Sequence, residues 1–159
     1  MIKLIGHVLI NLYLIIAAYI DHKTKNVYRI GSYLLIVLST MMFLGSGGSL
    51  LSPLFLERLV SILLMTAVVV LQGILKMMGW GDVFTYIGVF IYIASWNYEG
   101  LALELMAIYM LIANILFLIF NIRRFDWKNR KFKEEAAFLP AMAGAMVIEV
   151  IYIHLEGFL

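Results

Sequence analysis

The sequence of 159 residues contains no cysteine. Disulfide bonds, thiolate metal sites and cysteine nucleophiles are therefore excluded. Charge is also scarce, because Lys, Arg, Asp and Glu together supply 14% of the residues and leave a formal net charge of +2. This surplus of positive charge is small and unevenly placed, so nucleic-acid binding has little support.

Apolar residues dominate what is present. They make up 64% of the chain, and its mean hydropathy is +1.00. A soluble domain of this size could not hide that much apolar surface. The apolar residues come in blocks of about 16 to 25, the length that a helix needs to cross roughly 30 Å of hydrocarbon. The composition predicts an integral membrane protein.

We expect an all-α, polytopic membrane protein with about six transmembrane helices, forming a single membrane-embedded domain over residues 1–159. The first apolar block is too long for the core of a typical signal peptide, so we interpret it as a retained helix. The six predicted spans are 4–20, 30–45, 56–78, 82–97, 101–121 and 136–155.

The charges of the connections predict the orientation. Lys23, Lys25 and Arg29 follow the first span, and the connection 123–135 holds six of the twelve Lys and Arg residues. The connection NYEG at 97–100 has no basic residue. Because basic connections stay in the cytoplasm, the first, third and fifth connections are expected inside. Both termini are then expected outside the cell membrane.

Two aspartates stand at the predicted inner membrane edge. Asp21 closes the first span and Asp82 opens the fourth, whereas Asp126 lies among the basic residues of the last connection. Taken singly, each acid could be an ordinary helix-end residue. Taken together, two carboxyl groups in an apolar site share one proton, so that one activates water and the other acts as an acid. This chemistry needs no metal and no cofactor.

Three motifs resemble those of the type IV prepilin peptidase family of intramembrane aspartyl proteases. They are GWGD at 79–82, which matches the pattern GxGD, the run DHKTK that begins at Asp21, and FLPAMAG at 138–144 with Pro140. The chain departs from the family at Val27-Tyr28-Arg29, where Ile-Pro-Asn is common, and at Phe84, where Lys commonly follows GDV. It also lacks the cysteine-bearing insertion of larger members, so we expect peptidase activity without N-methylation.

The resemblance implies an aspartic endopeptidase with Asp21 and Asp82 as the catalytic pair. Its substrate would be a pilin, pseudopilin or archaellin-type precursor, whose leader peptide is removed at the cytoplasmic face. Gly79 and Gly81 would let an extended peptide approach the backbone. Trp80 is either a wall of that substrate groove or an interfacial anchor.

Pro140 either simply begins the last helix or holds its end open beside the acids.

The competing hypothesis is a non-enzymatic membrane protein, such as a small proton-coupled transporter or an inactive assembly scaffold of a secretion or pilus system. The expected partners are the precursor and the lipid bilayer, and the sequence does not indicate an oligomeric state.

Overall fold

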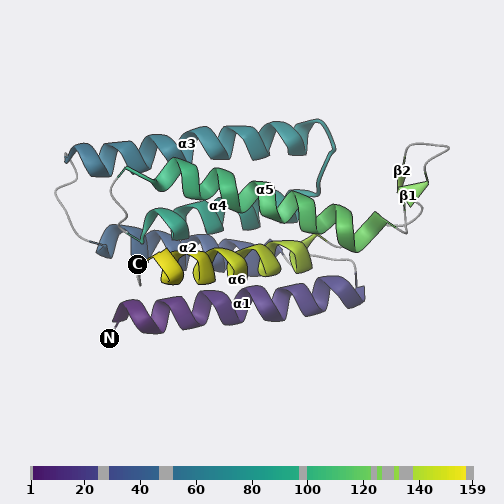
Figure 1. Cartoon of the computed structure of the whole chain (residues 1–159), viewed down its shortest axis with the longest axis horizontal. Helices are drawn as coiled ribbons and strands as arrows, with labels where there is room; N and C mark the ends of the chain where they lie inside the picture. The colour runs from purple at the N-terminus through teal and green to yellow at the C-terminus, as the bar shows by residue number, and fades with distance from the viewer. Residues whose placement is uncertain are drawn as a thin grey trace. The chain divides into compact units, whose positions relative to one another are not determined.

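The computed structural model describes residues 2–24, 29–46, 52–96, 100–122, 125–126, 131–132 and 138–156. These residues form helices, apart from one short hairpin (Figure 1). The helices are α1 (Ile2–Thr24), α2 (Arg29–Gly45), α3 (Pro53–Ile74), α4 (Trp80–Ala94), α5 (Ala102–Asn121) and α6 (Leu139–Glu156). The hairpin pairs strands β1 (Phe125–Asp126) and β2 (Lys131–Phe132) in antiparallel register.

The expected all-helical fold is confirmed for the described residues, and each predicted apolar segment overlaps one helix. The main differences are at helix ends. Helix α4 begins at Trp80 rather than at residue 82, because Gly79 has the extended backbone of an N-cap residue. The hairpin was not predicted. Most of the basic residues that predicted the orientation, including Lys25, Arg123 and Arg124, lie outside the described residues.

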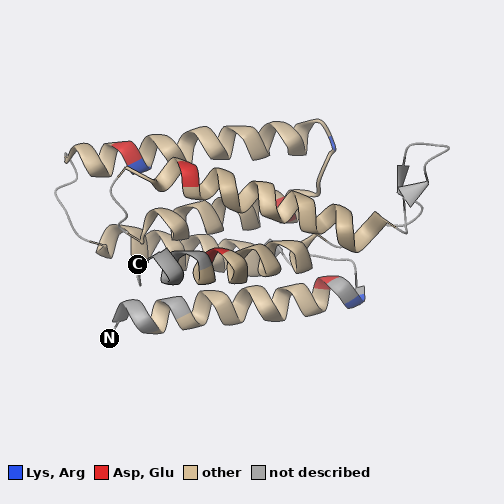
Figure 2. Ribbon diagram, in the orientation of Figure 1, with Lys and Arg blue, Asp and Glu red and all other residues tan. Residues whose placement is uncertain are grey.

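Two helices, α3 and α5, are long and apolar enough to cross a membrane. Each has a window of mean hydropathy 2.3 in which only 28% of the residues are buried. The core helix of a soluble protein would be mostly buried, whereas these two present large apolar side chains outward. Figure 2 shows how few charged residues the helices carry. The two helices indicate an association with a membrane.

The chain divides into two compact units, each described by itself. The first comprises Met1–Ile10 and Tyr28–Ala107, and the second comprises Asn11–Val27 and Ile108–Leu159. In the first unit, α4 packs against both α2 and α3. Its core is rich in aromatic side chains, and Tyr86, Phe90 and Tyr92 are almost completely buried.

Helices α2 and α4 run parallel along a close seam in the first unit. The Ser32 hydroxyl lies 3.3 Å from the carbonyl oxygen of Gly81 near the beginning of both helices. About two turns further along α4, a Cβ on Gly88 would lie 2.8 Å from Leu35 Cγ and 3.3 Å from the backbone nitrogen of Ile36. Glycine fits this position because a side chain would overlap Leu35 and lie tightly against the α2 backbone.

Helix α3 begins with a side-chain N-cap and runs antiparallel to α4. The Ser52 hydroxyl accepts a hydrogen bond from the Phe55 amide at 3.2 Å, and Pro53 occupies the first helical position. Near the other end of α3, a Cβ on Gly73 would lie 2.9 Å from a methyl group of Val83. The end of α3 thus packs against the first turns of α4.

The second unit joins α6 to parts of α1 and α5. The Tyr109 hydroxyl of α5 donates to the carbonyl oxygen of Met142 at 3.2 Å, and the rings of Phe117 and Phe138 stack with their centroids 4.5 Å apart. Asp21, near the end of α1, accepts a hydrogen bond from Leu139, the first residue of α6. The end of α1 and the beginning of α6 therefore meet.

The close seam leads to a first prediction. Replacing Gly88 by Ala should lower the free energy of unfolding in detergent by about 1–3 kcal/mol, because the new methyl group overlaps Leu35 and approaches the α2 backbone. The matched control is Gly45→Ala, since no atom lies within 4 Å of the Cβ position there. Equal unfolding midpoints for the two variants would contradict the close seam.

Candidate functional site

A tight turn carries the chain from α3 into the GWGD segment. The Met77 amide donates to the Gln72 carbonyl at 2.9 Å, and the Lys76 amide donates to the Gly73 carbonyl at 3.0 Å. This pair of bonds is a Schellman motif. Its left-handed position, usually glycine, is occupied by Lys76 with φ 56°. The turn therefore ends α3 shortly before α4 begins. The left-handed conformation of Lys76 costs some backbone strain.

Asp82 lies in the first turn of α4, three residues after the N-cap Gly79. A Cβ on Gly79 would lie 3.3 Å from Asp82 Oδ2, so the carboxyl group folds back toward the cap and glycine leaves room for it. An acid at this position is stabilised by the positive end of the helix dipole. The first glycine of GWGD thus has a local purpose, which is to accommodate the acid of the same motif.

The second glycine of the motif contributes its carbonyl oxygen. Gly81 O accepts a hydrogen bond from the Thr85 hydroxyl at 2.9 Å and one from the Ser32 hydroxyl at 3.3 Å. The two hydroxyl oxygens are 3.0 Å apart, and both side chains are fully buried. Neither Ser32 nor Thr85 was predicted from the sequence. The sequence feature that could have indicated them is a single hydroxyl residue near the beginning of each of these two apolar helices, α2 and α4.

An aromatic cluster flanks the same turn. The Phe84 ring lies 5.1 Å from the Tyr33 ring and 6.2 Å from the Trp80 ring, measured between centroids. Trp80 and Tyr33 are both about half exposed. Phe84, where lysine is common in the prepilin peptidases, therefore packs against both of these aromatic rings.

Asp21 is almost completely buried, with 3% of its surface exposed. Its Oδ2 accepts a hydrogen bond from the Leu139 backbone amide at 3.1 Å, across 118 positions of sequence. Leu139 is the first residue of α6 and Pro140, which has no amide hydrogen, is the second. Asp21 therefore caps the beginning of α6, where the partial positive charge of the helix end favours a carboxylate.

The predicted site residues thus fall into two groups. Gly79, Trp80, Gly81 and Asp82 belong to the first unit, whereas Asp21 and Pro140 belong to the second. The structure brings Asp21 to the residue next to Pro140, and it gathers the GWGD segment at the beginning of α4. The juxtaposition of Asp21 with Asp82 stays a prediction from the sequence.

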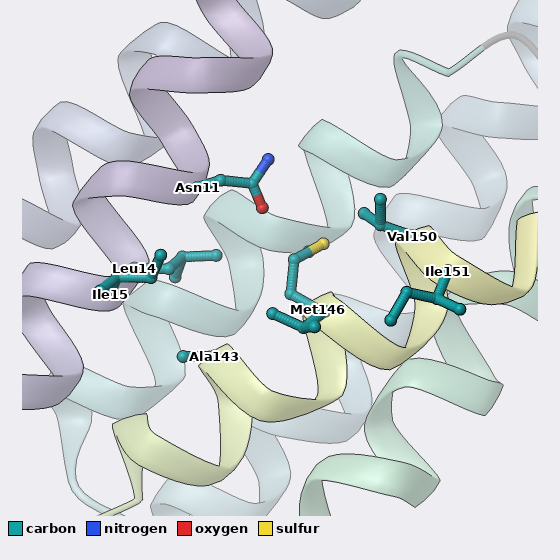
Figure 3. Close-up of a pocket in the computed structure, with 8 residues that line it drawn as sticks. Asn11, Leu14, Ile15, Ala143, Met146, Val150 and Ile151 are labelled. Atoms are coloured by element: carbon teal, nitrogen blue, oxygen red, sulfur yellow. The ribbon is translucent and has the colours of Figure 1, made fainter. Parts of the chain in front are cut away.

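The second unit also contains an apolar groove of about 250 Å³ (Figure 3). Leu14 and Ile15 of α1 line one side, and Met146 and Ile151 of α6 line the other. Asn11 supplies the polar group among its lining residues. The other lining residues are apolar, so the groove suits a hydrocarbon occupant.

Glu149 is a buried acid that the prediction did not assign to the site. It is 1% exposed, and neither carboxyl oxygen has a hydrogen-bond partner in the described part of the chain. A carboxyl group in an apolar helix is costly and commonly marks a functional position. No group of three or more His, Asp or Glu side chains within the described residues is arranged to hold a metal ion.

Comparisons of the chain with protein-family models, with curated proteins and with solved structures give no match.

The capping contact gives a second prediction. Asp21→Ala should lower the thermal stability by the equivalent of about 1 kcal/mol, because the Leu139 amide loses its acceptor. Asp21→Asn keeps an acceptor oxygen in the same place and should stay within about 0.5 kcal/mol of the parent. Unfolding in detergent, together with hydrogen exchange of the Leu139 amide, measures both.

The control for this experiment is Lys23→Ala, which removes an exposed charge from the same end of α1. If Asp21→Ala were no less stable than Lys23→Ala, Asp21 would have no capping role.

Proposed function

We propose that the protein is an intramembrane aspartic endopeptidase that cleaves the leader peptide from prepilin-like precursors at the cytoplasmic face. The observation that carries the proposal is the hydrogen bond between Asp21 and Leu139. It joins two of the three motifs on which the family resemblance rests, the aspartate ending α1 and the FLPAMAG segment beginning α6. A functional site built from these motifs requires that contact.

The proposal includes six membrane spans. Within their units, the end of α1 meets the beginning of α6, and α2 lies parallel to α4. Both relations are those of a chain that crosses the bilayer in alternating directions, in which spans one and six run oppositely and spans two and four run alike. In such a chain, the end of α1 and the beginning of α4 face the same side. Asp21 and Asp82 then share the inner membrane edge.

The proposed reaction is peptide-bond hydrolysis by two carboxyl groups. The ionised carboxylate takes a proton from water as the water oxygen bonds to the peptide carbonyl carbon. The protonated carboxyl donates a hydrogen bond to the carbonyl oxygen. Collapse of the tetrahedral intermediate breaks the C–N bond, and the leaving amine receives a proton from a carboxyl group. The assignment of base and acid between Asp21 and Asp82 stays open.

The environment of each acid supports this chemistry. Asp82 lies at the N-terminus of α4, and Asp21 meets the N-terminus of α6, so both carboxyl groups experience the positive end of a helix. Trp80, half exposed in the first turn of α4, provides an apolar surface for the hydrophobic segment that follows the scissile bond. Gly79 and Gly81 present backbone without side chains next to that surface.

A proton-coupled transporter is the second candidate, and Glu149 is the observation that favours it. Glu149 is buried in α6 and has no hydrogen-bond partner among the described residues. A buried acid of this kind in a membrane helix is a typical proton-carrying group. In that function Glu149 would bind and release a proton during transport, and Asp21 and Asp82 would be structural.

The third prediction concerns catalysis. Asp21→Asn and Asp82→Asn should each reduce cleavage of a co-expressed precursor by at least about 100-fold, because an amide cannot exchange the proton. Both variants should remain folded, since Asn keeps the acceptor oxygen. Immunoblots of precursor and mature protein, followed by purified enzyme in liposomes, measure the effect.

The control is Asp126→Asn, which removes the third aspartate of the chain and should leave cleavage unchanged. Normal processing by both single-site variants would eliminate the protease proposal. Proton-driven transport that is lost in Glu149→Gln, with no cleavage by the parent protein, would establish the transporter instead.

The fourth prediction tests the orientation, and the absence of cysteine makes it direct. A single cysteine at Met77, in the connection from α3 to α4, should react with an impermeant maleimide only from the cytoplasmic side. A single cysteine at Leu101, just before α5, should react only from the outside. Both native residues are exposed. Labelling of the two positions from the same side would contradict the six-span orientation.

A further inference from the structure

We infer that Ser32 and Thr85 are positioning residues, which hold the first turn of α4 against α2 and thereby orient the carboxyl group of Asp82. The inference deepens the proposed function and rests on it where it concerns catalysis. It rests on the structure alone where it concerns the orientation of residue 82.

The hydroxyl oxygens of Ser32 and Thr85 and the carbonyl oxygen of Gly81 all lie within hydrogen-bonding distance of one another. Thr85 Oγ1 lies 2.9 Å from Gly81 O, Ser32 Oγ lies 3.3 Å from Gly81 O, and the two hydroxyl oxygens are 3.0 Å apart. Two hydroxyl hydrogens serve these three contacts. When Thr85 donates to Gly81, Ser32 shares its hydrogen between the Thr85 oxygen and the Gly81 oxygen. Both hydroxyl groups then have a partner without water.

The carbonyl that receives these bonds belongs to the residue immediately before Asp82. Thr85 lies on the same helix as Gly81, so its hydrogen bond alone does not relate α4 to any other element. Ser32 supplies the bond that comes from α2. Rotation of α4 about its axis would move Gly81 O away from Ser32 Oγ and would move the Asp82 carboxyl group by the same angle. The serine therefore sets the direction of the acid.

The remainder of the seam reinforces this restraint. Gly88, close to the Leu35 side chain and the α2 backbone, keeps the two helices near enough for the short Ser32 side chain to reach α4. Thr85 and Gly88 are three residues apart and so lie on one face of α4. The face of α4 that contacts α2 thus includes the small residues Thr85 and Gly88. This closeness is what makes a hydroxyl bond between the helices attainable.

Helix α2 offers a matched control. Ser39 lies seven residues after Ser32, which places it on the same face of the helix, and it is equally buried. Its hydroxyl has no hydrogen-bond partner in the part of the chain that the structure describes. Loss of the Ser39 hydroxyl removes a buried polar group without breaking a bond. A change at Ser32 that exceeds the change at Ser39 then reports the bond to Gly81.

The experiment uses the full-length protein in liposomes and begins with a reporter that needs no enzymatic activity. Asp82→Cys introduces the one thiol of the chain, and its rate of alkylation by a small maleimide reports the position and exposure of the side chain at 82. The rate is measured in the parent, in Ser32→Ala, in Thr85→Val and in the double variant. The Ser39→Ala background and a cysteine at buried Ala94, at the other end of α4, are the controls.

The double variant should change the alkylation rate at position 82 by about fivefold or more, the factor expected from the loss of one ordinary hydrogen bond. Ser32→Ala alone should produce most of this change, because it removes the bond that comes from α2. Thr85→Val should change the rate less, because Ser32 then keeps its bond to Gly81. The rate at Ala94→Cys should stay the same in every background. Ser32→Thr and Thr85→Ser keep the hydroxyl and should restore the parent rate.

Equal rates at position 82 in the parent and the double variant would overturn the inference. So would a rate that rises equally at positions 82 and 94, because that result shows general loosening of α4. Ser39→Ala matching Ser32→Ala would likewise attribute the effect to lost packing rather than to the bond.

Cleavage by the Ser32 and Thr85 variants that keep Asp82 then tests the catalytic part of the inference. The double variant should lower kcat by about ten- to a hundredfold with little change in KM, since a misdirected acid weakens the chemical step and leaves substrate binding intact. A parent protein that cleaves no precursor refutes the proposed function alone, because the alkylation rates still decide the orienting role. A changed alkylation rate with unchanged kcat refutes only the catalytic consequence.

Discussion

A buried polar group in an apolar chain is stabilised by a partner within the protein, because neither lipid nor hydrocarbon side chains supply one. This constraint explains most of the specific contacts between helices. Asp21 reaches the free amide at the beginning of α6, and Ser32 reaches a carbonyl oxygen at the beginning of α4. The Tyr109 hydroxyl likewise donates to a backbone carbonyl of α6. Each of these bonds joins two helices at one defined position along their length.

Helix ends concentrate these contacts for a physical reason. The first amides of a helix have no partner inside it, so they attract acids. Asp82 lies in the first turn of its own helix, and Asp21 accepts a hydrogen bond from the first amide of another helix. The same arrangement that stabilises the fold gathers carboxyl groups at helix ends. A structural role and the proposed catalytic role are therefore compatible in one residue, and Asn substitution separates them because it retains the hydrogen-bond acceptor but not the exchangeable proton.

The prediction of the helices succeeded because long apolar blocks with short polar connections have few alternative structures. The beginning of α4 was predicted two residues too late, since Gly79 is the N-cap and Gly81 is already helical. Pro140 lies in the first turn of its helix, a position that both of its interpretations share. Phe84, a departure from the family pattern, packs against Trp80 and Tyr33, which the pattern itself could not indicate.

The sequence by itself determined the helical class, the apolar character of the chain and the identity of the acids, because these follow from composition and from residues adjacent along the chain. Tertiary structure alone decided that Asp21 bonds to Leu139 and that Ser32 bonds to Gly81. These pairs are separated by 118 and 49 positions. Such partners are selected by how helices pack, and packing depends on the shapes of whole helix faces rather than on any local pattern.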